Sequence, residues 1–237
     1  MAGKLGHGGA NGAPGSSDDE PGTIPGTGEM ETADEPKKLR YKVARILSDV
    51  GNAVTFSLIV GLIFSFIPPQ SVQPWIVFLV GFLVMVFAPG FFLVMAMKVW
   101  KVDFDFTDRA SRTPYYLVIE GCYAAGILIF SPWALPSWSM FNISIISVIL
   151  NGTLLIVNLK WKISAHAAGA AGPSVAIAII AGWWTLFITV PVVAGIIWSR
   201  LELKKHTPMQ LVYGAMVAIL SYGLVLLFLY PLHLFGA

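Results

Sequence analysis

Apolar residues gather into seven long stretches that begin near residue 52, and short polar or proline-containing stretches separate them. The apolar stretches cover residues 52–67, 75–97, 115–130, 139–159, 167–181, 183–198 and 208–230. About 20 apolar residues in a helix cross the hydrocarbon core of a membrane, which is roughly 30 Å thick. The pattern therefore predicts an all-α, polytopic membrane helix bundle with about six to seven transmembrane helices. Pro89 and Gly90 lie inside the second stretch and predict a kink there.

The chain before residue 52 follows a different pattern. Residues 1–36 are rich in Gly, Pro, Ser, Thr, Asp and Glu and hold few large apolar side chains. Such a segment buries too little apolar surface to offset its ordering entropy, so we expect residues 1–36 to form a disordered leader. Residues 37–51 hold a cluster of lysines and arginines and are interpreted as a basic juxtamembrane segment. Residues 52–237 form the predicted transmembrane domain.

Composition agrees with a membrane protein and excludes several other classes. Apolar residues make up 56% of the chain and charged residues 12%, about half of the roughly 25% that is typical of soluble domains. The single cysteine, Cys122, excludes an intrachain disulfide and a cysteine-based zinc site. A net charge of +2 is too small to predict a nucleic-acid partner. The expected partner is the lipid bilayer.

The charges of the loops predict an orientation in that bilayer. Lysines and arginines occur in the basic juxtamembrane segment and in loops at residues 98–112, 160–162 and 200–205. Neither residue type occurs in the remaining loops, which cover residues 68–74, 131–138, 182–183 and 231–237. Positively charged loops stay in the cytoplasm. We therefore expect a multi-pass protein of the cell membrane whose N-terminus and basic loops are cytoplasmic.

Three polar loops on this side hold the candidate chemistry, and two of them lead into predicted helix N-termini. Residues 207–210 (Thr-Pro-Met-Gln) form a capping-box pattern, so His206 lies just before the helix that follows. Ser164 is in position to cap the helix that directly follows it, which places His166 in that helix's first turn. Helix N-termini attract anions and disfavour a charged imidazole. Both histidines are therefore expected to be neutral until an anion binds.

Arginines complete this set of candidate residues. Arg109 and Arg112 lie in the first polar loop, and Arg200 lies in the third. The guanidinium group is planar and donates forked hydrogen bonds that match the oxygens of a phosphate. Two histidines, three arginines and two helix N-termini together predict a phosphate-binding site.

The order and spacing of these residues resemble those of a known family. Residues 199–206 (Ser-Arg, five residues, His) resemble the third signature of the type-2 phosphatidic acid phosphatase superfamily. Residues 164–166 (Ser-Ala-His) resemble its second signature, and residues 112–114 (Arg-Thr-Pro) resemble the first signature loosely. The resemblance covers roughly residues 98–230 and implies that this region folds as the helical core of that superfamily.

The resemblance also implies an activity, that of a phosphatase that needs no metal and no other cofactor. His206 would attack phosphorus and form a phosphohistidine, while His166 would protonate the leaving group. The groups that hold the phosphate oxygens would be Arg109, Arg112, Ser164 and Arg200. The implied substrate is a lipid phosphate or an isoprenyl diphosphate, with its tail between the helices and its phosphate at the cytoplasmic face.

Two positions depart from the family pattern. Asp105 stands seven residues before Arg112, where the family has a lysine, and Arg109 is the nearest residue that could supply that charge. Asp105 is kept as a candidate supporting residue. Gln210 replaces the aspartate that orients the nucleophilic histidine in the family. Its amide oxygen can accept the same imidazole hydrogen bond, but without a negative charge.

One acidic residue, Glu120, lies well inside an apolar stretch. An ionisable residue within a membrane span marks function by default. We expect Glu120 to support the site by pairing with Arg109 or Arg112, and the alternative is that its carboxylate reaches to the membrane interface. Three asparagines of a neighbouring stretch are expected to hydrogen-bond between helices: Asn142, Asn151 and Asn158.

Two other functions stay open. A catalytically silent protein that binds phosphate-bearing lipids could have the same fold, because Gln210 and the missing lysine depart from the family pattern. A magnesium-dependent intramembrane prenyltransferase needs two acidic loops. One would be the loop with Asp103, Asp105 and Asp108, but the other cytoplasmic loops offer only Glu202 for the second.

Overall fold

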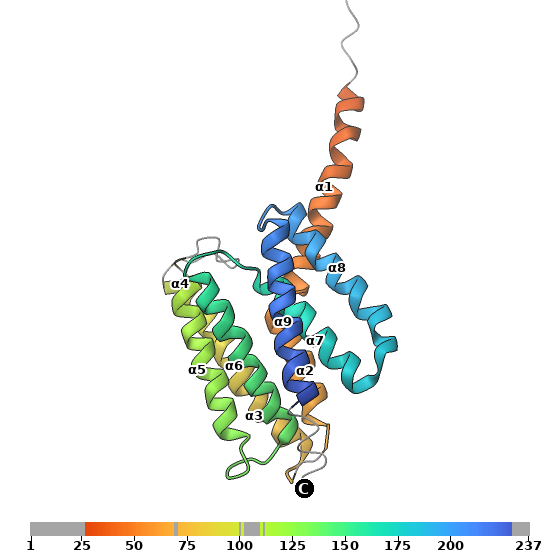
Figure 1. The fold of residues 1–237 in the computed structure, drawn as a ribbon. Helices are drawn as coiled ribbons and strands as arrows, with labels where there is room; N and C mark the ends of the chain where they lie inside the picture. The colour runs from red at the N-terminus through yellow and green to blue at the C-terminus, as the bar shows by residue number, and fades with distance from the viewer. Residues whose placement is uncertain (1–26, 69–70, 100, 102–109, 111, 229–237) are drawn as a thin grey trace, which may run out of the picture. The chain divides into compact units, whose positions relative to one another are not determined.

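The computed structural model describes residues 27–68, 71–99, 101, 110 and 112–228. These residues form helices and no strand, which confirms the all-α prediction. Met1–Lys37 and Lys38–Ala237 form two separate compact units. The helices (Figure 1) are α1 (Thr27–Val50), α2 (Ala53–Ser65), α3 (Pro74–Gly81), the π-helical segment η1 (Phe82–Phe87), α4 (Ala88–Val99), α5 (Arg112–Ile129), α6 (Trp138–Asn158), α7 (Ala165–Ala181), the 3₁₀ turn η2 (Trp183–Thr185), α8 (Leu186–Glu202) and α9 (Pro208–Phe228).

Helices form along each apolar stretch of the sequence, but α1 differs from the expectation. It begins at Thr27, inside the segment predicted to be a disordered leader. Residues 27–36 can be helical because this stretch contains good helix formers. The predicted disorder of residues 1–26 falls outside the described residues.

Several of the described helices are long and apolar enough to cross a membrane. Four runs meet this condition, namely Pro74–Val99, Trp138–Asn158, Trp183–Glu202 and Pro208–Phe228. The bent pair Lys37–Val50 and Val54–Ser65 would make a fifth span if it counts as one, and α7 is apolar but shorter. The chain therefore has the helices of a membrane protein, and the total of six to seven spans stays a prediction.

The second apolar stretch forms one helical run with a widened turn in front of Pro89. Proline has no N–H to donate to the carbonyl four residues earlier, so the regular α-helical ladder cannot continue through it. In η1 the ladder shifts to a longer repeat, and the N–H of Ala88 donates to the carbonyl of Leu83. The irregularity predicted at Pro89 and Gly90 thus takes the form of a π-helical segment immediately before the proline.

The helices α7 and α9 pack side by side (Figure 1). The first half of α7 consists of small residues, most of which are fully buried. Small side chains let two helix backbones approach closely. At Gly172 of α7, an added Cβ would lie 2.5 Å from the ring of Tyr222 on α9, so only glycine fits under this tyrosine. This contact fixes where α9 lies along α7.

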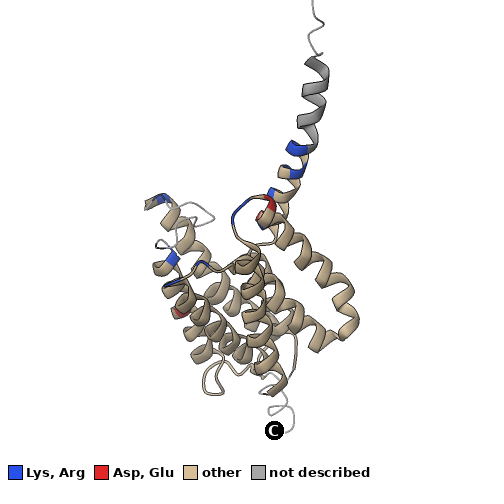
Figure 2. Ribbon diagram, turned by 45° about the horizontal axis from the view of Figure 1, so that its top comes forward, with Lys and Arg blue, Asp and Glu red and all other residues tan. Residues whose placement is uncertain are grey.

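Charged residues of the helix bundle lie toward one of its ends. In Figure 2 the lysines and arginines, drawn in blue, lie near the start of α5 and around the loop between α8 and α9. The described loops at the opposite end contain neither lysine nor arginine. The structure thus gathers the basic loops on one side of the bundle, as the loop charges of the sequence predicted.

Candidate functional site

A cavity of about 180 Å³ opens at the charged end of the bundle. Its lining includes Arg112 from α5, His166 from α7, Arg200 from α8 and His206 from the loop before α9. These residues come from three polar loops that lie far apart along the chain. The convergence that the motif spacing predicted is therefore present for four of the candidate residues.

The local sequence explains why two of these loops end at capped helix N-termini. The Ser164 side chain caps α7 by accepting a hydrogen bond from the N–H of Ala167 at 3.3 Å. At the start of α9, Thr207 Oγ1 accepts from the N–H of Gln210 at 3.4 Å, and Gln210 Oε1 accepts from the N–H of Thr207 at 3.2 Å. This reciprocal pair is a capping box, so both predicted caps are confirmed.

Direct hydrogen bonds tie the three helix starts together. The N–H of Ser164 donates to the backbone carbonyl of Gln210 at 3.2 Å, which joins the N-terminus of α7 to that of α9. Arg112 donates from Nη1 to the carbonyl of Ile163 at 3.2 Å, which joins the start of α5 to the same turn. Gly214 of α9 allows α7 and α9 to approach this closely, because an added Cβ would lie 2.5 Å from the carbonyl oxygen of Ser164. The starts of α5, α7 and α9 are thus joined to one another by hydrogen bonds.

The imidazole of His206 is oriented by Gln210. His206 Nδ1 lies 3.1 Å from Gln210 Oε1, the same atom that accepts from the N–H of Thr207. An atom that accepts a backbone N–H must be the amide oxygen, so Nδ1 carries the proton and donates. In a neutral imidazole the other nitrogen, Nε2, then keeps its lone pair. The histidine is held in the tautomer that a nucleophile requires.

His206 is neutral at physiological pH. Its side chain is 8% exposed. Burial, first, and the nearby positive charges of Arg200, Arg112 and Lys162 together lower its pKa to about 3, against an opposing effect of the Gln210 hydrogen bond. Desolvation and like charge both disfavour the imidazolium form. The expected neutrality of this histidine is thus explained by burial first and by its arginine neighbours second.

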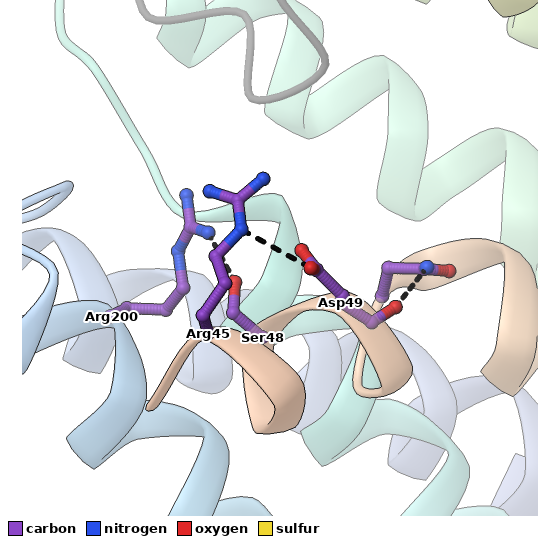
Figure 3. Close-up of polar contacts among 5 residues, drawn as sticks. Arg45, Ser48, Asp49 and Arg200 are labelled. Carbon is purple, nitrogen blue, oxygen red and sulfur yellow. Dashed lines mark hydrogen bonds and ion pairs between the residues drawn. The ribbon is translucent and has the colours of Figure 1, made fainter. Parts of the chain in front are cut away.

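Arg200 is the most deeply buried charge at the site, with 1% of its surface exposed. Its Nη1 donates to Ser48 Oγ at 2.6 Å, as Figure 3 shows. Ser48 belongs to α1, outside the region in which the sequence suggested a site. The two residues are 152 positions apart, and no sequence motif links them. Motif analysis therefore could not find Ser48.

Glu120 has a different partner from the arginines expected for it. Asn151 of α6 donates from Nδ2 to Glu120 Oε2 at 2.6 Å and also contacts the carbonyl of Tyr116 at 3.0 Å. Glu120 follows Arg112 by two helical turns, about 12 Å along α5, which separates the two groups. The expected ion pair with Arg112 is thus wrong, whereas the expected hydrogen bond between helices is confirmed for Asn151. Arg109 lies outside the described residues.

Beyond the charged end, the cavity continues between the helices and its lining becomes apolar. The apolar walls are formed by Leu93, Ile119, Leu150 and Leu154. The lining reaches Tyr123 on α5 and Tyr222 on α9. From Arg112 to Tyr123 the distance along α5 is about 16 Å at 1.5 Å per residue. The cavity is therefore cationic at one end, and most of its remaining lining is apolar.

The described residues contain no group of three or more His, Cys, Asp or Glu side chains that could hold a metal ion. The acidic loop with Asp103, Asp105 and Asp108 lies outside them. The candidate site thus consists of cationic, imidazole and backbone N–H groups. Such groups can bind a tetrahedral oxyanion, and the lone pair on His206 Nε2 can attack its central atom.

Comparison of the chain with protein-family models, with curated proteins and with solved structures finds no match.

Proposed function

We propose that this protein is an integral membrane phosphatase that removes phosphate from a lipid phosphate or an isoprenyl diphosphate, and that it is a divergent member of the type-2 phosphatidic acid phosphatase superfamily. One observation supports this most directly. Arg112, His166, Arg200 and His206 line one cavity that continues as an apolar channel between helices. Such a cavity matches a ligand with an anionic head and an apolar tail.

In the first chemical step, His206 Nε2 attacks phosphorus and the bond between phosphorus and the leaving oxygen breaks. His166 gives a proton to that oxygen as it leaves. The guanidiniums of Arg112 and Arg200 and the N-terminus of α7 at Ser164 hold the remaining phosphate oxygens, where negative charge spreads in the transition state. Arg109 belongs to the same proposal as a further cation of the first loop.

In the second step, water attacks the phosphorus of the phosphohistidine, and the bond between phosphorus and His206 Nε2 breaks, which returns the free imidazole. His166, now without its proton, accepts one from this water, and inorganic phosphate leaves. Gln210 keeps His206 in the reactive tautomer throughout, because its amide oxygen accepts from Nδ1. A glutamine stabilises an imidazolium less than an aspartate does, and burial keeps the histidine neutral before attack.

The arrangement in the membrane is part of the same proposal. Residues 98–230 would form the phosphatase core within a bundle of six to seven spans, and the charged end of the cavity would face the cytoplasm. Basic loops favour that side. A cytoplasmic site matches lipid intermediates that are made at the inner leaflet.

The deciding experiment is a phosphate-release assay on the purified full-length protein in lipid vesicles. Phosphatidate, phosphatidylglycerophosphate and isoprenyl diphosphates serve as substrates, with and without EDTA. We expect release that EDTA does not reduce and that His206→Ala abolishes. Lys160→Gln, a charge change at an exposed position on the same side of the bundle but outside the cavity lining, is the matched control and should keep the activity.

Two other outcomes would contradict the phosphatase. Turnover of an isoprenyl diphosphate that EDTA abolishes would favour the magnesium-dependent prenyltransferase. Binding of phosphate-bearing lipids without any phosphate release would favour the catalytically silent protein, a candidate supported by the neutral Gln210 in place of an aspartate. Trapping of acid-labile, base-stable phosphate on the protein would separate the phosphatase from both.

A further inference from the structure

The contact between Ser48 and Arg200 brings a segment outside the motif region to the site. Ser48 is 1% exposed, as is Arg200, and the hydrogen bond between them is 2.6 Å long. Hydrogen bonds to charged groups are stronger than those between neutral groups. A buried arginine with a fixed partner keeps one orientation, which a phosphate-binding group requires.

The end of α1 is held against α8 by contacts on both sides of Ser48. Gly51 packs so closely that an added Cβ would lie 2.6 Å from Ile196 of α8. On the other side, Arg40 pairs with Glu202 at 2.8 Å. Ser48 therefore has little freedom to move away from Arg200.

The chemistry of the partner matters as much as its position. A serine hydroxyl is neutral, so it can orient Arg200 while leaving the full positive charge for a phosphate. A carboxylate in its place would offset that charge. The neighbouring acid, Asp49, does not contact Arg200 in Figure 3 but pairs with Arg45 at 3.1 Å. The segment thus presents a neutral acceptor to the buried arginine and directs its acid elsewhere.

We propose that Ser48 is a positioning residue that holds Arg200 in the geometry for binding phosphate, so that α1 forms part of the site. This inference rests on the proposed phosphatase function. The inference gives the juxtamembrane segment, residues 37–51, a role in the reaction. The sequence alone indicated only that this segment is basic. Ser48 acts through Arg200 and does not itself touch the substrate.

The test compares Ser48→Ala with Ser48→Thr, which keeps the hydroxyl, and with Ser65→Ala as the matched control. Ser65 is also a fully buried serine, but its Oγ donates within its own helix, to the carbonyl of Gly61 at 2.6 Å. We expect Ser48→Ala to lower kcat/KM for phosphate release about 10- to 100-fold, the range for losing a hydrogen bond to a charged group. Ser48→Thr and Ser65→Ala should stay within about twofold of the unchanged protein, within the usual scatter of such effects.

A pH profile adds a readout that a purely structural role would not change. Arg200 lowers the pKa of His206. When Ser48→Ala lets the guanidinium move, that pKa rises toward its ordinary value, and the acid limb of kcat/KM moves to higher pH. Ser65→Ala should leave this limb in place.

A second measurement separates failure of this inference from failure of the proposed function. The affinity for inorganic phosphate is measured by thermal shift on the full-length protein and its variants, whether or not phosphate release occurs. We expect the dissociation constant to rise about tenfold in Ser48→Ala and to be unchanged in Ser65→Ala. If Ser48→Ala does not fold, Ser48→Cys replaces it, because the sulfur fills the site but accepts hydrogen bonds only weakly. If Ser48→Ala and Ser65→Ala have the same phosphate affinity and the same acid limb, the role of Ser48 is overturned. If the protein without substitutions binds phosphate but releases none from lipids, only the proposed phosphatase activity is overturned.

Discussion

At the scale of the residue, one glutamine side chain decides how His206 can react. Gln210 Oε1 accepts from the backbone N–H of Thr207 and from His206 Nδ1. The same atom therefore completes the helix cap and selects the imidazole tautomer. One geometry therefore satisfies two roles of this glutamine. The capping box would explain it without any chemistry, and the family resemblance implies that it orients the histidine.

Replacing Gln210 tests these two roles. Gln210→Leu removes the acceptor, so His206 loses its fixed tautomer, and we expect phosphate release to fall about 10²-fold or more. Gln210→Glu keeps the acceptor and adds a negative charge beside the imidazole. That charge stabilises the imidazolium and raises the pKa of His206 from about 3.

The pH profile of kcat/KM checks the sign of the second effect. His206 must be neutral to attack, so activity falls as pH drops through its pKa. A raised pKa therefore moves the acid limb to higher pH in Gln210→Glu than in the unchanged protein. The control is Ser174→Ala. Ser174 is buried in the interior of α7, and its Oγ donates to the backbone carbonyl of Ala170 at 2.9 Å. An acid limb that stays in place would show that residue 210 does not govern the histidine.

At the scale of the element, the site depends on how closely the starts of α7 and α9 approach. The backbone bond from Ser164 to Gln210 sets this spacing. Gly214 makes it possible, because its missing side chain leaves room for the carbonyl of Ser164. The starts of the two helices, each of which favours an anion, therefore lie next to each other.

Two glycines of α9 offer a matched pair of substitutions. In Gly214→Ala the new Cβ would lie 2.5 Å from the carbonyl oxygen of Ser164, so the helices must separate. We expect this variant to lose about 1–3 kcal/mol of stability, the usual cost of overpacking, and to lose most phosphate release.

Gly223→Ala is the control because nothing lies within 4 Å of its added Cβ. Alanine favours the helix by up to about 1 kcal/mol over glycine, so this variant should be equally or more stable and keep its activity. Thermal unfolding of the full-length proteins and the phosphate-release assay check both. Equal behaviour of the two variants would mean that the approach of α7 and α9 is not needed for the site.

At the scale of the whole molecule, a second, smaller cavity lies beside the candidate site cavity. It is enclosed among α2, η1 and α6. The residues that line both are Ser57, Met85, Val86, Tyr123, Ser147 and Tyr222. The ring of Tyr222 is fixed in this partition by its contact with Gly172. If the apolar channel holds a lipid tail, this partition limits the length of that tail.

Tyr222→Leu tests the partition by shortening one of its side chains. We expect the variant to prefer a substrate with a longer tail, because the two cavities would join. Phosphate release from single-chain isoprenyl phosphates of increasing length gives the measurement. Tyr222→Phe keeps the ring and should keep the preference, and the exposed Tyr213→Ala on the same helix should do so as well. An unchanged length profile in Tyr222→Leu would place the tail outside this cavity.

Several features could be predicted from the sequence because they depend on neighbours along the chain. The apolar stretches gave the helices, and the Ser164 cap and the 207–210 capping box formed as expected. A cap needs only residues within one turn, so local sequence contains the whole signal. Helix α1 was not predicted, because residues 27–36 have a composition typical of disorder that also contains good helix formers.

The partners across the bundle could not be predicted in the same way. Glu120 meets Asn151 rather than Arg112, and Arg200 meets Ser48. Which side chains meet depends on how the helices rotate and slide against one another, and close contacts of glycines such as Gly214 decide this. The sequence by itself determined an all-helical chain with the apolar helices of a membrane protein, the helix caps and the residue types of the candidate site. Only packing in three dimensions decided that four of those residues share one cavity. They come from segments far apart along the chain, and the local sequence does not determine how such segments are placed relative to one another.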